Sequence, residues 1–398
     1  MELPLHGRQV LDLTRNVAGP YASMILGELG ADVIKVEEPS HGDDARGWGP
    51  PFWGDDSAVF LALNRNKRSI TLDLAQQGSK PIMERLVGRS DVVIESFRPG
   101  GLDALGYGYE WARERNPSVI YCSITGFGNR GPRRAQPGYD PITQALSGLM
   151  SVTGSPGGSP VRVGTSIVDM GAGMWASISI LGALVTRDQT GIGCRVNVSL
   201  YETALAWMAY HLGGFWATGR TPVPHGSAHA SIAPYQLIRC QDGEVMIGAA
   251  NDSIYKRLCN ALNLPELSSD PRFAHNSDRV LNRDSLIQEI ERVTSNRRRD
   301  ELIQVLDDHG VPCAPLQAVD AVAADPQALA LGIFQSLEHP NAQGFQSVGM
   351  PFEFDEHRPP LRRRPPFKGE HNLEVLTEIG FSVEEVESLL QSMTVRQQ

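Results

Sequence analysis

The chain has 398 residues, of which 41% are hydrophobic and 21% charged, a composition typical of a globular protein with two or three domains. Its formal net charge of -10 argues against a nucleic-acid-binding protein, because such proteins usually present a basic face. Five dispersed cysteines without a C-x-x-C spacing, and a start without a basic and then apolar leader, predict reduced thiols and a cytoplasmic location.

The first half of the chain alternates between short apolar strands and helices. We expect strands over 9–14, 32–37, 69–74, 91–97 and 118–125, and helices over 20–30, 78–89 and 102–116. Two longer apolar helices follow, over 167–187 and 200–217. This alternation predicts an α/β fold with a doubly wound, mostly parallel sheet that is covered by helices on both faces.

The longest apolar segment, 167–185, raises the question of a membrane span. It contains Asp169 and three glycines, and it is barely long enough to cross a bilayer. We therefore expect a buried helix of a protein that does not enter the membrane.

The composition changes near residue 218, where a stretch rich in Gly, Pro and small polar residues begins. Beyond it we expect a hairpin over 235–240 and 244–248, and helices over 252–263, 281–294 and 298–309. These elements predict a small α+β domain over 223–325, whereas 1–222 form a large domain. In the tail we expect a strand over 347–354 and a final helix over 383–393.

The stretch Gly126–Gly131, GFGNRG, follows an expected strand and has the G-x-G-x-x-G spacing of a dinucleotide site. Such a site needs a helix that begins within the glycines, so that its N-terminus meets the pyrophosphate. Pro132, and Pro137 next to Gly138, cannot begin that helix. The sequence therefore predicts a tight loop at the carboxyl end of a strand, and argues against a site for NAD or FAD.

Segments across nearly the whole chain resemble the family III coenzyme A transferases, the group named for formyl-CoA transferase. The matching stretches are VLDLT (10–14), AGP (18–20), LGADVIKVE (29–37), NRNKRSITLD (64–73), SFRPG (96–100), GYD (138–140), VD (168–169), APYQ (233–236), DG (242–243), GVPCAP (310–315) and GEH (369–371). The resemblance implies a large domain completed by the second chain end, here 326–398, a small domain, and a homodimer whose subunits interlock like links of a chain.

The resemblance places Asp169 at the family's nucleophile position, and Tyr139 is our second candidate catalytic residue. Asp169 lies in the first turn of an expected helix, where it can act as a helix cap and where free N–H groups would keep its carboxylate ionised. The implied chemistry runs through an aspartyl anhydride and an aspartyl-CoA thioester, without ATP, a permanently bound cofactor or a metal. The chain shows no His or Cys cluster with metal-ligand spacing.

The resemblance also implies where CoA binds, and one loop is a candidate for stabilising the oxyanion. The CoA positions are Val17, Ala18, Leu72, Ala75, Ser96, Phe97, Arg98, Tyr139 and Asp140. Formyl-CoA enzymes carry arginines where this chain has Glu38 and Ala104, so Arg98, Lys67 or Arg68 would have to supply that charge. The loop 226–231, with Gly226, Ser227 and His229, could donate N–H groups to an oxyanion; alternatively it is a plain linker.

The same fold hosts α-methylacyl-CoA racemases, which have His where this chain has Tyr139. Tyrosine, with an ordinary pKa near 10, is a poor base, so transfer is favoured over racemisation. A non-catalytic CoA-binding protein is the other alternative. Further stretches resemble the branch that contains succinyl-CoA:glutarate CoA-transferase, namely 12–15, 18–27, 49–52, 121–126 and 229–235. This resemblance implies a succinyl-CoA donor and a dicarboxylate acceptor. Arg15 or Arg46 could bind the carboxylate of the acceptor that does not react. Arg46 can equally be a solvated surface residue.

Overall fold

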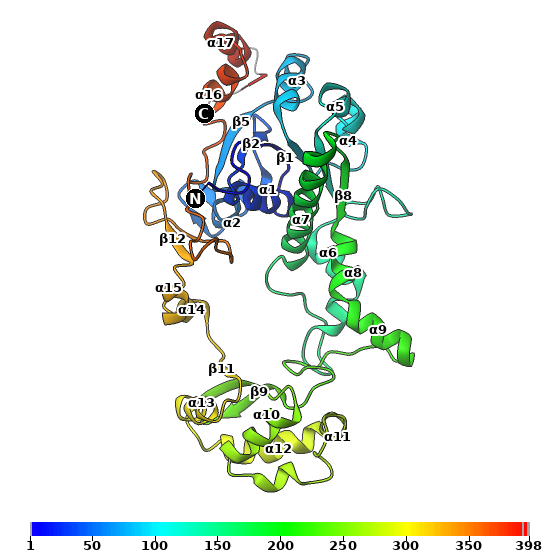
Figure 1. Cartoon of the computed structure of the whole chain (residues 1–398), viewed down its shortest axis with the longest axis vertical. Coiled ribbons are helices and arrows are strands. Elements are labelled where there is room, and N and C mark those ends of the chain that lie inside the picture. Colours follow the sequence, from blue (N-terminus) through cyan, green and yellow to red (C-terminus); the bar gives the residue numbers. More distant parts are fainter. Residues whose placement is uncertain (1, 392–393, 396–398) are drawn as a thin grey trace. The chain divides into compact units, whose positions relative to one another are not determined.

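The computed structural model describes residues 2–391 and 394–395, and the chain forms two compact units (Figure 1). The larger unit comprises 1–149, 162–217 and 329–398, and the smaller comprises 150–161 and 218–328. The sequence assigned 150–161 to the larger domain. That assignment is wrong because the carbonyl of Gly154 accepts the N–H of Gly226 at 2.9 Å, which ties the segment to the smaller unit.

A six-stranded parallel sheet forms the centre of the larger unit, with the order β5-β2-β1-β6-β7-β8. Its strands are β1 (Gln9–Leu13), β2 (Asp32–Glu37), β5 (Lys67–Thr71), β6 (Val92–Glu95), β7 (Ile120–Thr125) and β8 (Arg195–Ser199). Inner strands of such a sheet are covered on both faces, and β1, β6 and β7 accordingly read as largely hydrophobic runs. The edge strands β5 (KRSIT) and β8 (RVNVS) carry several polar side chains. The predicted α/β fold with a mostly parallel sheet is confirmed.

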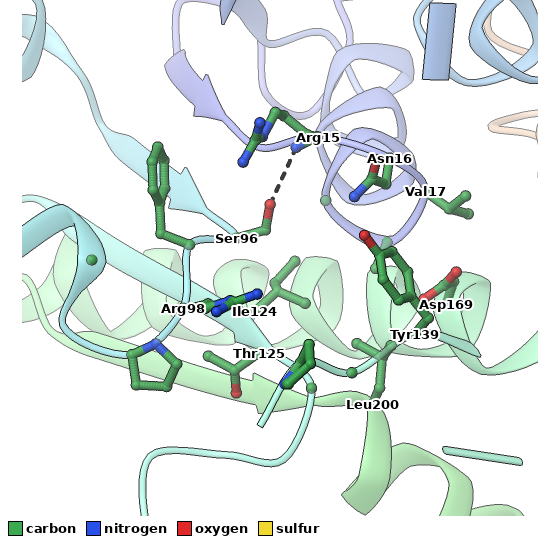
Figure 2. A pocket seen from close by; sticks show the side chains of 18 of the residues that line it. Arg15, Asn16, Val17, Ser96, Arg98, Ile124, Thr125, Tyr139, Asp169 and Leu200 are labelled. Atoms are coloured by element: carbon green, nitrogen blue, oxygen red, sulfur yellow. Dashed lines mark hydrogen bonds between the residues drawn. The ribbon is translucent and has the colours of Figure 1, made fainter. Parts of the chain in front are cut away.

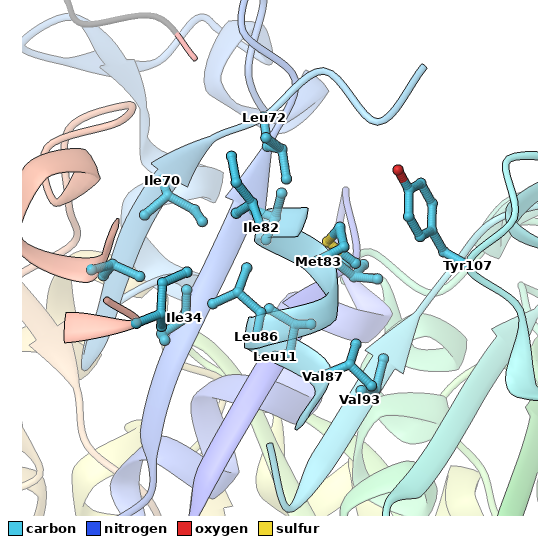
Figure 3. Packing of buried hydrophobic residues seen from close by; sticks show 14 of the residues in the cluster. Leu11, Ile34, Ile70, Leu72, Ile82, Met83, Leu86, Val87, Val93 and Tyr107 are labelled. Atoms are coloured by element: carbon cyan, nitrogen blue, oxygen red, sulfur yellow. The ribbon is translucent and has the colours of Figure 1, made fainter. Parts of the chain in front are cut away.

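Helices cover both faces of this sheet, because alternate side chains of each strand point to opposite faces. On one face, Leu11, Ile34 and Val93 pack against Ile82 and Leu86 of α3 (Figure 3). The helices here are α3 (Ser79–Arg89), α4 (Gly101–Ala104), α5 (Tyr109–Arg115), α16 (Asn372–Glu378) and α17 (Val383–Gln391). The opposite face is covered by α1 (Ala18–Glu28), α7 (Ile167–Thr190) and α8 (Leu200–Trp207).

The remaining elements of the larger unit are short. They are the 3-10 helix η1 (Asp44–Gly47), the hairpins β3 (Phe52–Trp53) with β4 (Asp56–Ser57) and β12 (Phe334–Ser336) with β13 (Gln346–Val348), and the helices α2 (Ala58–Leu63), α6 (Asp140–Ser147) and α9 (Ala209–Thr218).

Several sequence-based elements differ from the structure. The strand expected over 69–74 is β5 and ends at Thr71, and β8 was not predicted. The helix expected over 102–116 is split into α4 and α5, because Gly106 adopts a left-handed φ of 86° between them. The helix expected over 200–217 is split into α8 and α9. The strand expected over 347–354 ends at Val348, and Pro351 beyond it has no N–H with which to extend a ladder. The final helix begins at Val383 as predicted, and residues 392–393 lie outside the described part of the chain.

Among the described residues, α7 is the one helix long and apolar enough to cross a membrane. A core helix of a globular protein passes the same test, and one face of α7 is buried through Ala172, Ala176 and Ile180. Gly173 lies at the crossing with α1, where an added Cβ would stand 2.6 Å from the carbonyl oxygen of Ala18. The helix is therefore built into the sheet domain, as the sequence predicted.

The smaller unit contains an antiparallel sheet in the order β11-β10-β9, with β9 (Tyr235–Cys240), β10 (Gly243–Gly248) and β11 (Cys313–Pro315). The helices that follow the hairpin are α10 (Asp252–Ala261), α11 (Asn276–Leu281), α12 (Arg283–Thr294), α13 (Arg299–Asp308), α14 (Val319–Ala323) and α15 (Pro326–Ala330), with η2 (Met150–Val152) and η3 (Pro265–Ser268) as short 3-10 helices. The hairpin and three of these helices are those the sequence predicted.

Candidate active site

An open cavity of about 440 Å³ lies where the strand order of the large sheet reverses. From β1 the chain proceeds to β2 and β5 on one side, whereas β6, β7 and β8 lie on the other. The loops after β1 and β6 diverge at such a point, and open α/β sheets bind ligands there. The cavity is lined by residues 15–19, 96–99, 101, 124–126 and 136–139, and by Asp44, Asp169 and Leu200 (Figure 2). The loop Gly126–Gly131 thus follows a strand end, as predicted, and its first glycine lines the cavity.

Asp169 lies in the first turn of α7, half-buried, with its side chain at the cavity wall near Tyr139 (Figure 2). The sequence predicted that the free N–H groups of this turn would hold its carboxylate. They are instead taken by Asp140, whose Oδ2 accepts the N–H of Val168 at 2.8 Å and that of Asp169 at 3.3 Å. Burial, together with the negative charge of Asp140, raises the pKa of Asp169 to about 7. The carboxylate is therefore only partly ionised at neutral pH.

Asp140, which the resemblance places among the CoA positions, is 2% exposed and is not among the lining residues of this cavity. Its second oxygen accepts the side-chain amide of Gln144 at 2.5 Å, and Gln144 in turn accepts the N–H of Val163 at 2.9 Å. Asp140 thus links the first residue of α6 to the start of α7. This contact joins residues 28 positions apart, and no local pattern in the sequence signals it.

The N-terminus of α1 opens into the same cavity. Val17 is the N-cap, and Ala18 and Gly19 form the first turn together with Pro20, which has no N–H. First-turn N–H groups have no partner within a helix, and they attract negative charge. The close crossing at Gly173 brings this turn of α1 against α7 one turn beyond Asp169.

Arg15 and Arg98 are the cationic side chains among the lining residues of this cavity, and both are exposed. The backbone N–H of Arg15 donates to Oγ of Ser96 at 3.2 Å (Figure 2), and its guanidinium lies 5.9 Å from the centre of the Phe97 ring. Its guanidinium also lies 3.7 Å from a carboxylate oxygen of Asp44. Such an exposed pair is weak, and the guanidinium can turn to an anionic ligand.

The structure does not bring Arg46 to this cavity, and it contradicts both sequence interpretations of that residue. Arg46 is 8% exposed; its guanidinium pairs with Glu37 at 2.7 Å and Asp56 at 3.0 Å and lies over the Phe60 ring. Lys67 and Arg68 are likewise engaged. Lys67 is bound by Asp12 at 3.2 Å, and Arg68 pairs with Asp32, Glu374 and Glu378. Of the proposed replacements for the missing arginines, only Arg98 has access to a ligand in the cavity.

A second cavity of about 200 Å³ adjoins the first and shares Arg15 and Phe97 with it. It is lined by Leu72 and Ala75, together with Leu13, Val36, Glu37, Glu38, Asp73, Leu74 and Leu105. The predicted CoA positions therefore fall into two neighbouring groups, of which the second is mostly apolar. Ala104 is absent from this lining, and its neighbour Leu105 is present.

The loop with Gly226, Ser227 and His229 belongs to the smaller unit, and its groups are already hydrogen-bonded there. The N–H of Gly226 donates to Gly154 and that of His229 to Tyr235, both at 2.9 Å, and Oγ of Ser227 accepts the N–H of Leu237. In this conformation the backbone N–H groups of Gly226 and His229 are therefore not available to an oxyanion.

Comparison with known proteins identifies the family. The CoA-transferase family III model matches residues 5–372. The chain belongs to this family. Human succinyl-CoA:glutarate CoA-transferase is 38% identical over 380 residues, which cover 94% of this chain and 86% of that protein. Acetyl-CoA:oxalate CoA-transferase from Acetobacter aceti is 41% identical over 328 residues, which cover 82% of this chain and 84% of that protein.

A solved structure of a CAIB/BAIF family protein from Brucella suis matches this CoA-transferase with a TM-score of 0.84 at 39% identity, covering 95% of this chain and 100% of that one. The fold and the family agree over nearly the whole length. The two named relatives act on different acids, so family membership alone does not fix the acceptor of this transferase.

Proposed function

We propose that this CoA-transferase moves CoA from succinyl-CoA to a dicarboxylate such as glutarate, with Asp169 as the nucleophile. The observation that carries the proposal is the position of the Asp169 carboxylate. It lines the cavity at the switch point of the sheet, beside the first turn of α1, with a pKa raised to about 7. A desolvated carboxylate is a stronger nucleophile than a hydrated one once it is ionised.

The proposed reaction begins with attack of an Asp169 oxygen on the thioester carbonyl. The tetrahedral intermediate collapses, the C–S bond breaks, and a mixed anhydride and CoA thiolate remain. The thiolate then attacks the aspartyl carbonyl, releases succinate and forms an aspartyl-CoA thioester. The acceptor carboxylate attacks this thioester, the aspartyl C–S bond breaks, and a second mixed anhydride and CoA thiolate form. The thiolate then attacks the acceptor's carbonyl carbon in this anhydride, which gives the new acyl-CoA and frees the carboxylate of Asp169. Each step conserves an activated acyl bond, so the scheme uses neither ATP nor a metal nor a permanently bound cofactor.

The negative charge of each tetrahedral intermediate needs donors near Asp169. We assign this role to the first-turn N–H groups of α1, at Ala18 and Gly19, because that turn opens into the cavity and abuts the start of α7. In this proposal they take the place of the loop 226–231, where the backbone N–H groups of Gly226 and His229 are bonded to other carbonyl oxygens.

The two adjoining cavities suggest how the substrates lie. The apolar walls at Leu72 and Ala75 suit the nucleotide end of CoA, and Phe97 and Arg98 lie between that end and Asp169. Arg15 lines both cavities, so its guanidinium can meet a phosphate of CoA or the far carboxylate of the acid. Glu38 lines the second cavity, and its negative charge would repel a phosphate of CoA. Arg15 and Arg98 are therefore the cationic side chains that we expect to bind the phosphates.

The racemase alternative requires a base beside Asp169, and the lining residues of the described cavity include no histidine. Tyr139 stands at the sequence position where the racemases have histidine, and it is 52% exposed. We propose that Tyr139 contacts the acyl-CoA rather than abstracting a proton. Deuterium uptake at Cα from heavy water would favour racemisation instead.

The decisive experiment is a panel of carboxylic acids tested against succinyl-CoA, with the wild-type protein and Asp169→Asn. We expect transfer to dicarboxylates by the wild type, no transfer by the variant, and a hydroxylamine-sensitive adduct on Asp169 after incubation with acyl-CoA. Calorimetry should show CoA binding to both proteins and no binding of NAD or FAD. CoA binding without transfer to any acid would favour the non-catalytic alternative, and full activity of the variant would exclude the mechanism.

A further inference from the structure

The loop between β1 and α1 contains a residue in the left-handed region. Asn16 has a φ of 72°, in the left-handed region that residues other than glycine seldom occupy. Its neighbours Arg15 and Val17 line the candidate active site, as Asn16 itself does. A backbone of this kind persists only where surrounding contacts determine it. The contacts that hold Asn16 therefore also determine where these lining residues lie.

Two buried charged side chains, Lys35 of β2 and Asp43, form hydrogen bonds with the backbone of this loop. Oδ1 of Asp43 accepts the N–H of Asn16 at 2.9 Å, and Nζ of Lys35 donates to the carbonyl oxygen of Thr14 at 2.9 Å. The two side chains pair with each other at 2.8 Å, and both are 0% exposed. They thus bind the peptide groups on either side of Arg15.

A second buried pair holds the following segment. Nζ of Lys67 donates to the carbonyl oxygen of Pro20 at 2.9 Å and lies 3.2 Å from Asp12. Asp12 in turn accepts the N–H of Thr14 at 2.9 Å. The chain is therefore bound on both sides of the lining residues 15–19, by side chains that come from three neighbouring strands.

Stability alone does not explain a fully buried Lys35–Asp43 pair. The free energy needed to remove two charges from water offsets most of the electrostatic attraction between them. Apolar side chains of similar volume therefore often replace such pairs without loss of stability. Burial by itself would lower the pKa of Lys35, but the charges of Asp43 and Asp12 outweigh it and raise that pKa, so the lysine stays charged. What an apolar pair could not supply is the donor for Thr14 and the acceptor for Asn16.

We propose that Lys35 and Asp43 are positioning residues of the transfer reaction, which fix the β1–α1 loop so that Arg15 and the first turn of α1 meet the acyl-CoA. This inference rests on the proposed function for its catalytic readout. It also has a structural readout, the rigidity of residues 14–19, which does not depend on that function.

The test compares two double variants. Lys35→Met with Asp43→Leu removes both contacts to the loop and leaves no unpaired buried charge. Glu28→Leu with Arg65→Met is the matched control, because this ion pair at 2.6 Å is equally buried and its side chains do not line either cavity. We expect the first variant to remain folded, with kcat reduced by about tenfold to a hundredfold and with faster amide hydrogen exchange over 14–19. The control should keep the wild-type kcat per folded molecule and the wild-type exchange in this segment.

A third variant, Lys35→Met with Asp43→Asn, retains an acceptor for the N–H of Asn16 and should recover much of kcat. A merely structural role would lower the folded fraction in all three variants and leave kcat per folded molecule unchanged. Unchanged kcat and unchanged exchange in the first variant would overturn the proposal. If the wild type transfers CoA to no acid, the proposed function fails; the exchange over 14–19 and the affinity for CoA, measured by calorimetry, then decide the positioning role alone.

Discussion

The carboxylate of Asp140 accepts the backbone N–H of Asp169 at 3.3 Å, so two acidic side chains meet at the start of α7. Asp140 takes the helix N–H groups that would otherwise stabilise the charge of Asp169. Its own charge and the burial of Asp169 both disfavour ionisation, and they raise the pKa of Asp169 to about 7. The nucleophile proposed here is thus tuned by a residue that does not itself reach the substrate.

This relationship predicts the pH dependence of the reaction. Because an ionised Asp169 is required for attack, kcat/KM should fall as the pH decreases below about 7. Asp140→Asn removes the repelling charge but keeps an oxygen for the helix N–H groups. The acid limb of the profile should therefore shift to lower pH, and the ratio of activity at pH 6 to that at pH 8 should rise.

The exposed Asp188 provides a control for the overall change in net charge, since Asp188→Asn should leave the acid limb unmoved. Asp140→Asn also disturbs the bond to Gln144, and we expect it to cost about 1 kcal/mol of stability. An unchanged acid limb in a folded Asp140→Asn protein would show that Asp140 does not tune the nucleophile.

The raised pKa of Asp169 should also make the stability of the protein depend on pH: activity increases as the pH rises towards 7, whereas the contribution of Asp169 to stability decreases. Asp169 has a folded-state pKa of about 7 and an ordinary value of 3.8, so the folded state binds its proton more tightly than the unfolded state. The stability of the wild type therefore falls as the pH rises from about 4 to about 7. Asp169→Asn does not titrate, and above pH 7 it should be more stable by about 1–2 kcal/mol, a value reduced because the side chain is half-exposed.

Urea unfolding at pH 5 and pH 8 measures this difference, which should be larger at pH 8. Asp188→Asn again serves as the control, with the same pH dependence as the wild type. A gain of stability in Asp169→Asn that is equal at both pH values would contradict the raised pKa.

The inner strands of the sheet were predictable because they are short, largely apolar runs between turn residues, as at Asp32–Glu37, where the predicted and observed bounds coincide. The edge strand β8 (RVNVS), which alternates polar and apolar residues, was not predicted. The helix breaks at Gly106 and Met208 were missed, because an apolar periodicity continues across both. The residues of the site were accessible through the family resemblance, not through local pattern. The contact of Asp140 with the start of α7 joins segments 28 residues apart. Arg46 meets Glu37 and Asp56, which are 9 and 10 residues away, but a single sequence gives no sign of which acid an arginine will meet.

The crossing of α1 and α7 offers a test that uses two glycines of one helix. A Cβ on Gly173 would stand 2.6 Å from the carbonyl oxygen of Ala18, so Gly173→Ala must move α1 away from α7. We expect a loss of about 1–3 kcal/mol in stability and a larger loss in kcat than in CoA affinity, because the first turn of α1 moves relative to Asp169. Gly182→Ala is the control: nothing lies within 4 Å of its Cβ.

Since alanine favours a helix over glycine, Gly182→Ala should raise stability by up to about 1 kcal/mol and leave activity unchanged. Thermal unfolding, steady-state kinetics and calorimetry with CoA separate the two variants. Wild-type kcat in a folded Gly173→Ala protein would mean that the close crossing has no part in catalysis.

The helices α7 to α9 expose large apolar side chains that a lone subunit would present to water. Trp216 is 74% exposed, Tyr210 66% and Ile178 53%, and α9 has no buried residue. An apolar surface of this kind is typical of a protein interface. We therefore predict a homodimer, and the resemblance further implies that its subunits interlock. In linked rings, subunits separate only when one chain unfolds or opens, so dissociation should follow unfolding and not concentration.

Light scattering over about a thousandfold dilution should therefore report a constant dimer mass. Tagged and untagged dimers that are mixed in the folded state should not exchange subunits, whereas co-expression, or joint unfolding and refolding, should give mixed dimers. An ordinary dimer joined by surface contact would exchange without unfolding. A monomer with intact circular dichroism at low concentration would rule out interlocking.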